Sequence, residues 1–242
     1  MDWTDRAIVI GLRKHGETSV ILEAMTEHHG RHLGIVRSGR SRTMQPTLQA
    51  GNSVTLVWRA RLEEHMGVFV VEADNLRAGR LMASPMALQG LHWLAALLRL
   101  LPERDPHAGL FAMAEAIAEH FDEAALAPEL VVRFELAILA ELGFGLDLES
   151  CAATGLRDDL VYVSPKSGRA VSRDAGAAYA DRMLPLPHFI GSEAGGVSAE
   201  EWEAGLRLTG HFLRRDLFEP RGLMETMASR DLFAREARRA AE

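Results

Sequence analysis

The first eighty residues alternate apolar, β-branched runs with short polar turns, a pattern typical of strands rather than helices. Gly11 and Gly34 fall inside two of these runs, where a small barrel bends tightly. The strands are expected at residues 6–13, 18–26, 31–39, 53–62 and 66–73. Five short strands in so few residues predict a small closed barrel. The five-stranded OB-fold is the favoured form, and a small SH3-like barrel is the alternative.

From Ser84 onward the apolar residues adopt the spacing of amphipathic helices. Ser84 with Pro85 has the sequence of a helix start, and Ser198 with Glu201 has that of a capping box. Helices are expected at 84–102, 105–123, 127–145, 198–218 and 222–240. The predicted fold class is therefore α+β. An OB-fold nucleic-acid-binding domain in 1–80 is followed by an all-helical domain in 81–242, with an irregular, loop-rich insertion at about 146–197.

The formal net charge of −7 is unevenly distributed along the chain. Residues 1–80 carry eleven Lys and Arg against nine Asp and Glu, whereas residues 81–242 carry sixteen against twenty-five. Such asymmetry suggests separate partners for separate domains. The single cysteine excludes an intrachain disulfide and favours a reducing cytoplasm. No membrane association is expected, because no apolar run is long enough to span a bilayer and the first residues lack the basic region of a signal peptide.

Six arginines between residues 31 and 61 have no Asp or Glu among them. Ordinary surfaces mix both signs of charge, and arginine grips phosphate with a planar fork that lysine lacks. The connection 38–52 adds Gly and Ser, which let backbone N–H groups approach an anion. We therefore expect capture of a nucleic-acid backbone, with a merely solvated surface as the alternative. The candidate DNA-binding residues are Arg13, Lys14, Arg31, Arg37, Arg40, Arg42, Arg59 and Arg61.

This capture would be electrostatic and would weaken steeply with salt. The sequence contains no basic helix of the helix-turn-helix or basic-zipper type, so sequence-specific duplex reading is not expected. Trp58 could stack on a base, although a tryptophan inside a strand more often packs in the core.

The stretch beginning at Cys151 has the outline of a zinc ribbon, which needs four soft ligands around the metal. The four positions in register are Cys151, Thr154, Ser172 and Ala175, of which one is a thiol. We therefore expect a degenerate zinc-ribbon region that packs without metal. Cys151 is expected to be a small buried hydrophobe rather than a nucleophile.

His28, His29 and His32 are the other metal candidate. Adjacent side chains in a strand or turn point in opposite directions, so a polar turn before a strand is the favoured interpretation. The sequence contains no phosphate-binding loop, nucleophile elbow or zinc-protease motif. Neither catalytic residues nor a cofactor are expected. The acidic pairs Glu63–Glu64 and Glu200–Glu201 are expected in a turn and in the first turn of a helix.

The stretch HGETSVILEAMTEHHGRHLGIVRSGRSR resembles the amino-terminal signature of the RecO family of bacterial recombination mediators. The resemblance continues through LQAGNSVTLVWRARLEEHMGVF, FELAILAELGFGLDLESC and VYVSPKSGRAVS, and so covers nearly the whole chain. It implies an OB domain followed by a helical domain, and a role in DNA repair and recombination without enzymatic activity. The basic residues that match the family's basic OB face are Arg31, Arg37, Arg40 and Arg42, with Arg59 and Arg61 placed less securely. Some family members carry a four-cysteine zinc site, from which this sequence departs at three positions.

The resemblance also implies partners and a location. Family members bind single- and double-stranded DNA, anneal complementary strands and associate with RecR. They recognise the carboxyl-terminal tail of single-stranded DNA-binding protein and help to load RecA, which places them in the cytoplasm, with the nucleoid. A tail of that kind needs an apolar pocket with a basic rim, and the candidates for the rim are Arg99, Arg133, Arg207, Arg214 and Arg215. Two alternatives stay open: a helical docking scaffold with incidental nucleic-acid contact, and a nuclease, which the lack of a carboxylate cluster disfavours.

Overall fold

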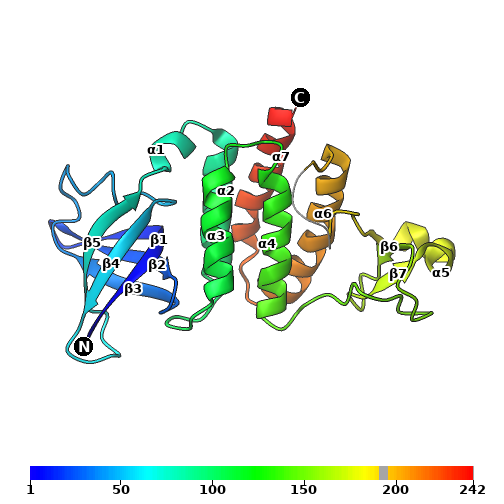
Figure 1. The fold of residues 1–242 in the computed structure, drawn as a ribbon, viewed down its shortest axis with the longest axis horizontal. Helices are drawn as coiled ribbons and strands as arrows, with labels where there is room; N and C mark the ends of the chain where they lie inside the picture. Colours follow the sequence, from blue (N-terminus) through cyan, green and yellow to red (C-terminus); the bar gives the residue numbers. More distant parts are fainter. Residues whose placement is uncertain (191–195, 242) are drawn as a thin grey trace. The chain divides into compact units, whose positions relative to one another are not determined.

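The computed structural model describes residues 1–190 and 196–241. The chain divides into two compact units, the barrel unit Met1–Asp122 and the helical unit Glu123–Glu242 (Figure 1). The barrel unit contains β1 (Asp2–His15), β2 (Ser19–Thr26), β3 (Arg31–Val36), β4 (Ser53–Arg59), β5 (Val68–Asn75), α1 (Ala78–Leu81), α2 (Pro85–Leu98) and α3 (Ala108–His120). The change from strand to helix thus falls near residue 80, while α1 to α3 cluster with the strands.

The five strands form a closed barrel in the order β1-β2-β3-β5-β4. β1 closes it, because its first half pairs with β4 and its second half with β2, with a register shift between Val9 and Gly11. β3 and β5 run parallel, and the other neighbouring strands are antiparallel. The expected five-stranded barrel is therefore confirmed, and Gly11 lies at the irregularity that lets a long strand bend.

Buried and exposed positions alternate along the strands, and the buried side chains fill the barrel interior. The core consists of Ala7, Val9, Val20, Leu22, Ala24, Val36, Leu48, Val54, Leu56, Trp58 and Phe69. Trp58 is 1% exposed and donates its Nε1–H to the Met66 carbonyl at 2.9 Å, so it packs in the core and presents no open ring face. Gly34 has no side chain because a Cβ there would overlap the Phe69 ring.

The helical unit is built from α4 (Ala127–Glu141), α6 (Ala199–Phe212), which contacts α4, and α7 (Ala228–Ala241), which contacts α6. The expected helix starts are present, since the Ser84 hydroxyl accepts from the Ala87 N–H and the Ser198 hydroxyl from the Glu201 N–H. Gly143 follows α4 with a φ of 85°. The smaller elements are β6 (Leu160–Val163), β7 (Ala170–Ser172), α5 (Arg173–Gly176), η1 (Ala177–Arg182), β8 (Leu184–Pro185), η2 (Leu213–Phe218) and η3 (Met224–Met227).

The expectation of an all-helical second domain with an irregular insertion is wrong in one respect. A three-stranded sheet of order β7-β6-β8 lies within 146–197. Its strands are two to four residues long, too short for a period to show in the sequence. A turn closed by the Gly168 N–H to Ser164 carbonyl bond, with Gly168 at a φ of 70°, connects β6 to β7. Residues 191–195 of the expected insertion lie outside the described residues.

Across the described part of the chain, every helix is too short or too polar to cross a lipid bilayer.

Candidate nucleic-acid interface

The eight candidate residues all lie on the barrel. Arg13 and Lys14 stand near the end of β1, Arg31 begins β3, and Arg59 ends β4. Arg37, Arg40 and Arg42 belong to the connection between β3 and β4, and Arg61 to that between β4 and β5. All of these side chains are exposed except that of Arg31. Seven of the eight candidate side chains therefore lie at the surface, and their role in binding DNA stays a prediction.

Arg31 is held by internal carboxylates. Its side chain is 14% exposed, and its Nη1 lies 2.8 Å from Glu23 Oε1 and 3.5 Å from Glu103 Oε1. Its Nε–H also donates to the Leu101 carbonyl at 3.2 Å. On the other side of the same carboxylate, Arg99 donates from Nε to Glu23 Oε2 at 2.8 Å. Sequence reasoning missed this Glu23 cluster (Glu23, Arg31, Arg99 and Glu103) because its members come from four separate segments.

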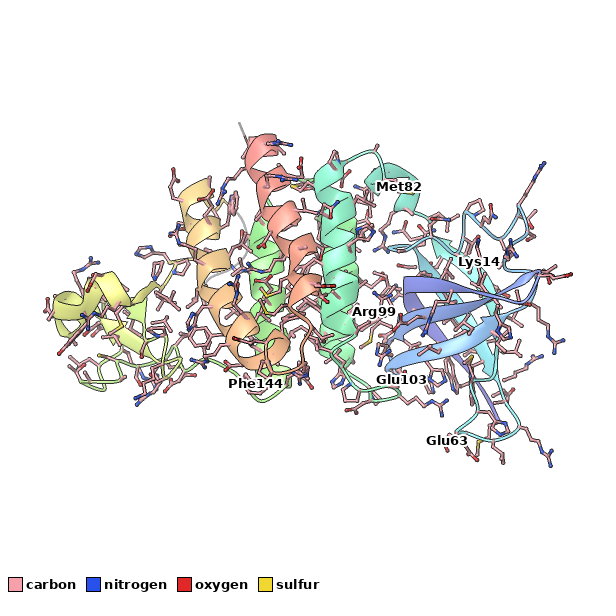
Figure 2. All side chains as sticks on the ribbon, turned by 180° about the vertical axis from the view of Figure 1, so that it is seen from behind. Lys14, Glu63, Met82, Arg99, Glu103 and Phe144 are labelled. Atoms are coloured by element: carbon pink, nitrogen blue, oxygen red, sulfur yellow. The ribbon has the colours of Figure 1, made fainter. Side chains whose placement is uncertain are left out.

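Figure 2 labels Arg99, which directly follows α2, and Glu103 further along the same connection, both beside the barrel. Arg99 also donates to the Ile10 carbonyl at 3.0 Å, and a Cβ at Gly11 would overlap its guanidinium. Gly11 therefore serves close approach as well as the bend of β1. Of the residues proposed for a basic rim around a protein tail, Arg99 thus has a structural role within the barrel unit.

Arg37 and Arg59 border one groove, which we call the Arg37–Arg59 groove. Their convergence follows from strand register, because Arg59 pairs with Val68 while Val36, next to Arg37, pairs with Phe69. The groove has a volume of about 480 Å³ and is also lined by Val36, Met44, Val68, Phe69, Val70 and Val71. No carboxylate of the described residues lines it, and Val70 on its floor is 49% exposed. Two cations over an apolar floor suit the phosphates and sugars of a nucleic-acid strand.

The β1–β2 hairpin is a neighbour of this groove around the barrel wall. Lys14 pairs with Val20, Val20 pairs with Val36, and Val36 pairs with Phe69. The end of β1, the start of β2, the end of β3 and the start of β5 therefore lie in one row. Lys14 is labelled on this part of the barrel in Figure 2. Register thus brings Arg13 and Lys14 to the same end of the barrel as Arg37 and Arg59.

The connection between β3 and β4 is ordered by its own hydrogen bonds. Arg40 donates from Nη1 to the Glu17 carbonyl at 2.5 Å, and its N–H donates to the Thr18 carbonyl at 3.0 Å. Leu48 anchors the connection in the core. Arg40 also lines a groove of about 380 Å³ together with the hydroxyls of Thr18, Ser38 and Ser41. The connection is therefore a shaped surface, and neither Arg37 nor Arg42 meets a carboxylate within the described residues.

His28 and His29 do not point in opposite directions, so that expectation is wrong. His28 Nδ1 lies 3.0 Å from Asp5 Oδ1, and His29 Nδ1 lies 2.8 Å from Asp5 Oδ2. The residues form a bend rather than a strand, which lets both rings turn to one carboxylate. Burial alone would raise the pKa of Asp5, but the hydrogen bonds from the two histidines outweigh it and hold this pKa below its usual value. Asp5, twenty-three residues from His28, was missed in the sequence.

Cys151 is buried, as expected, and its sulfur is surrounded by two of the degenerate ribbon positions. The N–H and Oγ–H of Ser172 donate to Sγ at 3.3 and 3.4 Å. These bonds from Ser172, followed by one from Thr154, lower the pKa of the thiol to about 6. Serine and threonine hydroxyls are poor zinc ligands, and both hydroxyls point their hydrogen bonds at the sulfur. The residues present do not fit a ribbon zinc ion.

The helical unit has a groove of its own between α6 and α7. It has a volume of about 470 Å³, and Leu206, Met227 and Ala234 contribute apolar surface to it. Arg207 and Arg214 line it together with Glu203 and Asp231, and neither arginine forms an ion pair among the described residues. The two other rim candidates are engaged, Arg133 by Glu129 and Arg215 by Asp216. The structure therefore ranks candidates that the sequence left equal.

Comparison with known proteins gives consistent matches along the chain. The family model described as Recombination protein O N terminal matches residues 1–73, and the model described as Recombination protein O C terminal matches residues 86–225. A protein named DNA repair protein RecO from Rhizobium leguminosarum bv. trifolii is 59% identical over 241 residues, covering 99% of this chain and 94% of the relative. Proteins of the same name are 57% identical over 243 residues in Agrobacterium fabrum (100% and 95% covered) and 58% over 225 residues in Mesorhizobium japonicum (92% and 88% covered).

Proposed function

The chain belongs to the RecO family, and from this premise we propose that it is a non-enzymatic mediator of recombination in DNA repair. In this role the barrel binds single- and double-stranded DNA, and the protein anneals complementary strands. The observation that carries the proposal is the Arg37–Arg59 groove, because its two guanidiniums flank an apolar floor and, within the described part of the chain, meet no carboxylate there. A polyanion can be held there without displacing an internal ion pair.

We propose that the barrel is of the OB type. Its closed strand order β1-β2-β3-β5-β4 supports this assignment. OB-folds hold oligonucleotides on the middle strands and on the connections that follow β1 and β4. Lys14 borders the first of these connections, Arg61 lies in the second, and Arg37 directly follows the middle strand β3. The charged positions of this chain therefore coincide with the ligand-bearing positions of the OB architecture.

The proposed DNA track consists of Arg13, Lys14, Arg37, Arg40, Arg42, Arg59 and Arg61. Arg31, which matches the family's basic face, would act differently in this chain. Its guanidinium holds β3 to Glu23 and Glu103, so it positions the barrel surface instead of meeting phosphate. Contacts of this kind carry no base information, which suits annealing of arbitrary sequences.

We also propose protein partners for the helical unit: RecR, the carboxyl-terminal tail of single-stranded DNA-binding protein, and RecA as the protein that is loaded. The groove between α6 and α7 is the candidate dock for the tail. It combines apolar surface with Arg207 and Arg214, and an acidic peptide with apolar residues needs both. An Arg207→Ala/Arg214→Ala change should weaken binding of such a peptide while leaving DNA binding intact.

The test of DNA binding is single-strand affinity measured as a function of salt, for the wild type and for Arg37→Ala/Arg59→Ala. Each lost phosphate contact lowers the slope of log affinity against log salt by about 0.7 on single strands, so the double change should lower it by about 1.4. Arg157→Ala/Arg182→Ala is the matched control. It removes the same charge from side chains of the helical unit that are 78% and 80% exposed. An unchanged affinity and slope in the groove variant would favour the docking scaffold, and strand scission in magnesium would favour a nuclease.

A further inference from the structure

A cluster of metal-ligating side chains lies at the start of β1 and in the bend between β2 and β3, away from the Arg37–Arg59 groove residues. Asp5 is its centre, with a side chain only 3% exposed and both carboxylate oxygens in contact with histidine Nδ1 atoms. Potential ligand atoms of Asp5, Glu27 and His28 all lie within 4.8 Å of one another. His29 approaches the other oxygen of the same carboxylate at 2.8 Å. Two imidazoles and two carboxylates are therefore supplied by only two segments, β1 and the bend at residues 27–29.

The spacing of these atoms suits a small divalent ion. Zinc binds nitrogen and oxygen at about 2.0–2.2 Å, so two of its ligands in a tetrahedron stand about 3.3 Å apart. His28 Nδ1 and Asp5 Oδ1 are 3.0 Å apart before any ion enters. Imidazole with carboxylate is a ligand set for zinc and its neighbours rather than for magnesium, which prefers oxygen and retains its waters.

His32 provides a second, independent sign of a ligand in this region. It is 4% exposed, and neither ring nitrogen has a hydrogen-bond partner. Buried polar atoms without partners are rare because each costs about 1–3 kcal/mol. His32 lines the same cavity of about 410 Å³ as His28 and His29, together with Trp3 and Trp58. The cavity thus contains an imidazole with unused hydrogen-bonding and metal-binding capacity.

A nucleobase is a poorer occupant of this cavity. Trp3 stacks on His29 at 4.2 Å between ring centroids and on Trp58 at 5.6 Å, so its ring is already engaged in two stacked contacts. The guanidinium of Arg104 at the cavity wall donates to the backbone carbonyls of Glu63 and His65. The aromatic rings are therefore engaged with one another, and the cavity meets the cluster around Asp5 only through His28 and His29, which line it.

We propose that Asp5, Glu27 and His28, with His29 on the second oxygen of Asp5, bind one zinc-like divalent transition-metal ion. This site is separate from the degenerate ribbon around Cys151 and does not depend on the proposed function. A bound ion would connect β1 to the bend between β2 and β3 and so stabilise that end of the barrel. Its coordination would be completed by water.

The test is calorimetric titration of Zn²⁺ into tag-free, metal-free full-length protein. The wild type should bind one equivalent, and His28→Ala should bind at least tenfold more weakly. His28 has a side chain that is 67% exposed, so its removal should leave the barrel folded. The matched control is His92→Ala, which removes an exposed histidine of α2 in the same unit and should bind like the wild type. Equal affinity in His28→Ala and the wild type, or no binding by the wild type, would overturn the proposal.

Two further measurements keep the result unambiguous. Glu27→Gln preserves size while removing a carboxylate, and it should also weaken binding, so it decides the matter if His28→Ala fails to fold. Cys151→Ser should retain the full equivalent, and loss of binding in that variant would place the ion at the ribbon and refute the site at Asp5. The same Zn²⁺ concentration should raise the melting temperature of the wild type by more than that of His28→Ala.

Discussion

Most arginines of the helical unit meet a carboxylate, whereas most of the candidate arginines on the barrel meet none among the described residues. Arg230, for example, is buried against Glu135, and Arg133 lies on Glu129. Arg37 and Arg59 instead border an apolar groove. The residue type is the same, and the difference lies in whether the fold brings an acidic side chain to the guanidinium. An arginine is available to an external phosphate where the fold supplies no internal anion.

The largest effect is expected where the arginine is most deeply paired. Glu135→Ala would leave Arg230 buried and unpaired, which should lower the free energy of unfolding by about 3–5 kcal/mol. Denaturant unfolding measures this value. Glu203→Ala, which removes the exposed partner of Arg238, is the control and should change stability by less than about 1 kcal/mol. A loss of similar size in both variants would refute the contrast between buried and surface pairs.

An intermediate effect is expected at Glu23, which is 7% exposed between Arg31 and Arg99. Glu23→Gln should destabilise the barrel unit by about 1–3 kcal/mol, because charge-assisted hydrogen bonds are lost. It should also raise single-strand affinity and steepen its salt dependence, since two guanidiniums lose their carboxylate. Glu17→Gln removes an exposed acid from the β1–β2 turn and serves as the control for net charge. If stability and affinity changed equally in both variants, Glu23 would have no special role.

A smaller effect is expected from adding a carboxylate to the groove. Val70→Glu would place a carboxylate on the floor between Arg37 and Arg59. Both arginines would then have an internal anion to pair with. One such charge at about 4 Å in water is worth about 1 kcal/mol, or roughly fivefold in single-strand affinity at low salt. Val70→Thr keeps the shape without the charge and should bind like the wild type. Equal binding by Val70→Glu and Val70→Thr would argue against a strand lying in this groove.

The last prediction concerns sulfur, as a second case of a partnered group in the helical unit. Hydrogen bonds from Ser172 lower the pKa of Cys151 to about 6. A lowered pKa stabilises the fold at high pH. This contribution to stability should be absent below about pH 6, rise between about pH 6 and the ordinary thiol pKa, and be fully present above the ordinary pKa. Thiolate absorbance at 240 nm, with Cys151→Ser as the blank, should titrate near pH 6. A midpoint above pH 8 would contradict the hydrogen-bonded thiolate.

The barrel was accessible from the sequence because its strands are long enough to show alternation. Val54, Leu56 and Trp58 all point inward at a period of two, and the turn at Glu63 to His65 separates two such runs. The strands at 160–163 and 170–172 contain too few residues to show a period, and they depend on pairing with each other. Tertiary pairing, absent from local pattern, decides such short elements.

The candidate site was accessible only as a set of exposed cations. Charge counting found Arg37 and Arg59, but their convergence on one groove follows from the register of β3, β4 and β5. Charge counting also included Arg31 among the free cations, because its partners Glu23 and Glu103 lie outside the acid-free stretch of sequence. Asp5 escaped notice for the same reason, because no local pattern connects it to His28. Partners that are distant in sequence are the common cause of these failures.

The Glu23 cluster has a consequence for how this protein should be dissected. A fragment that ends at residue 80 would keep Glu23 and Arg31 but lose Arg99, Glu103 and the Arg104 contacts that hold the β4–β5 connection. A fragment that ends at residue 122 retains all of them. Expression trials of the amino-terminal half should therefore favour the longer piece, and the shorter one should be prone to proteolysis and aggregation.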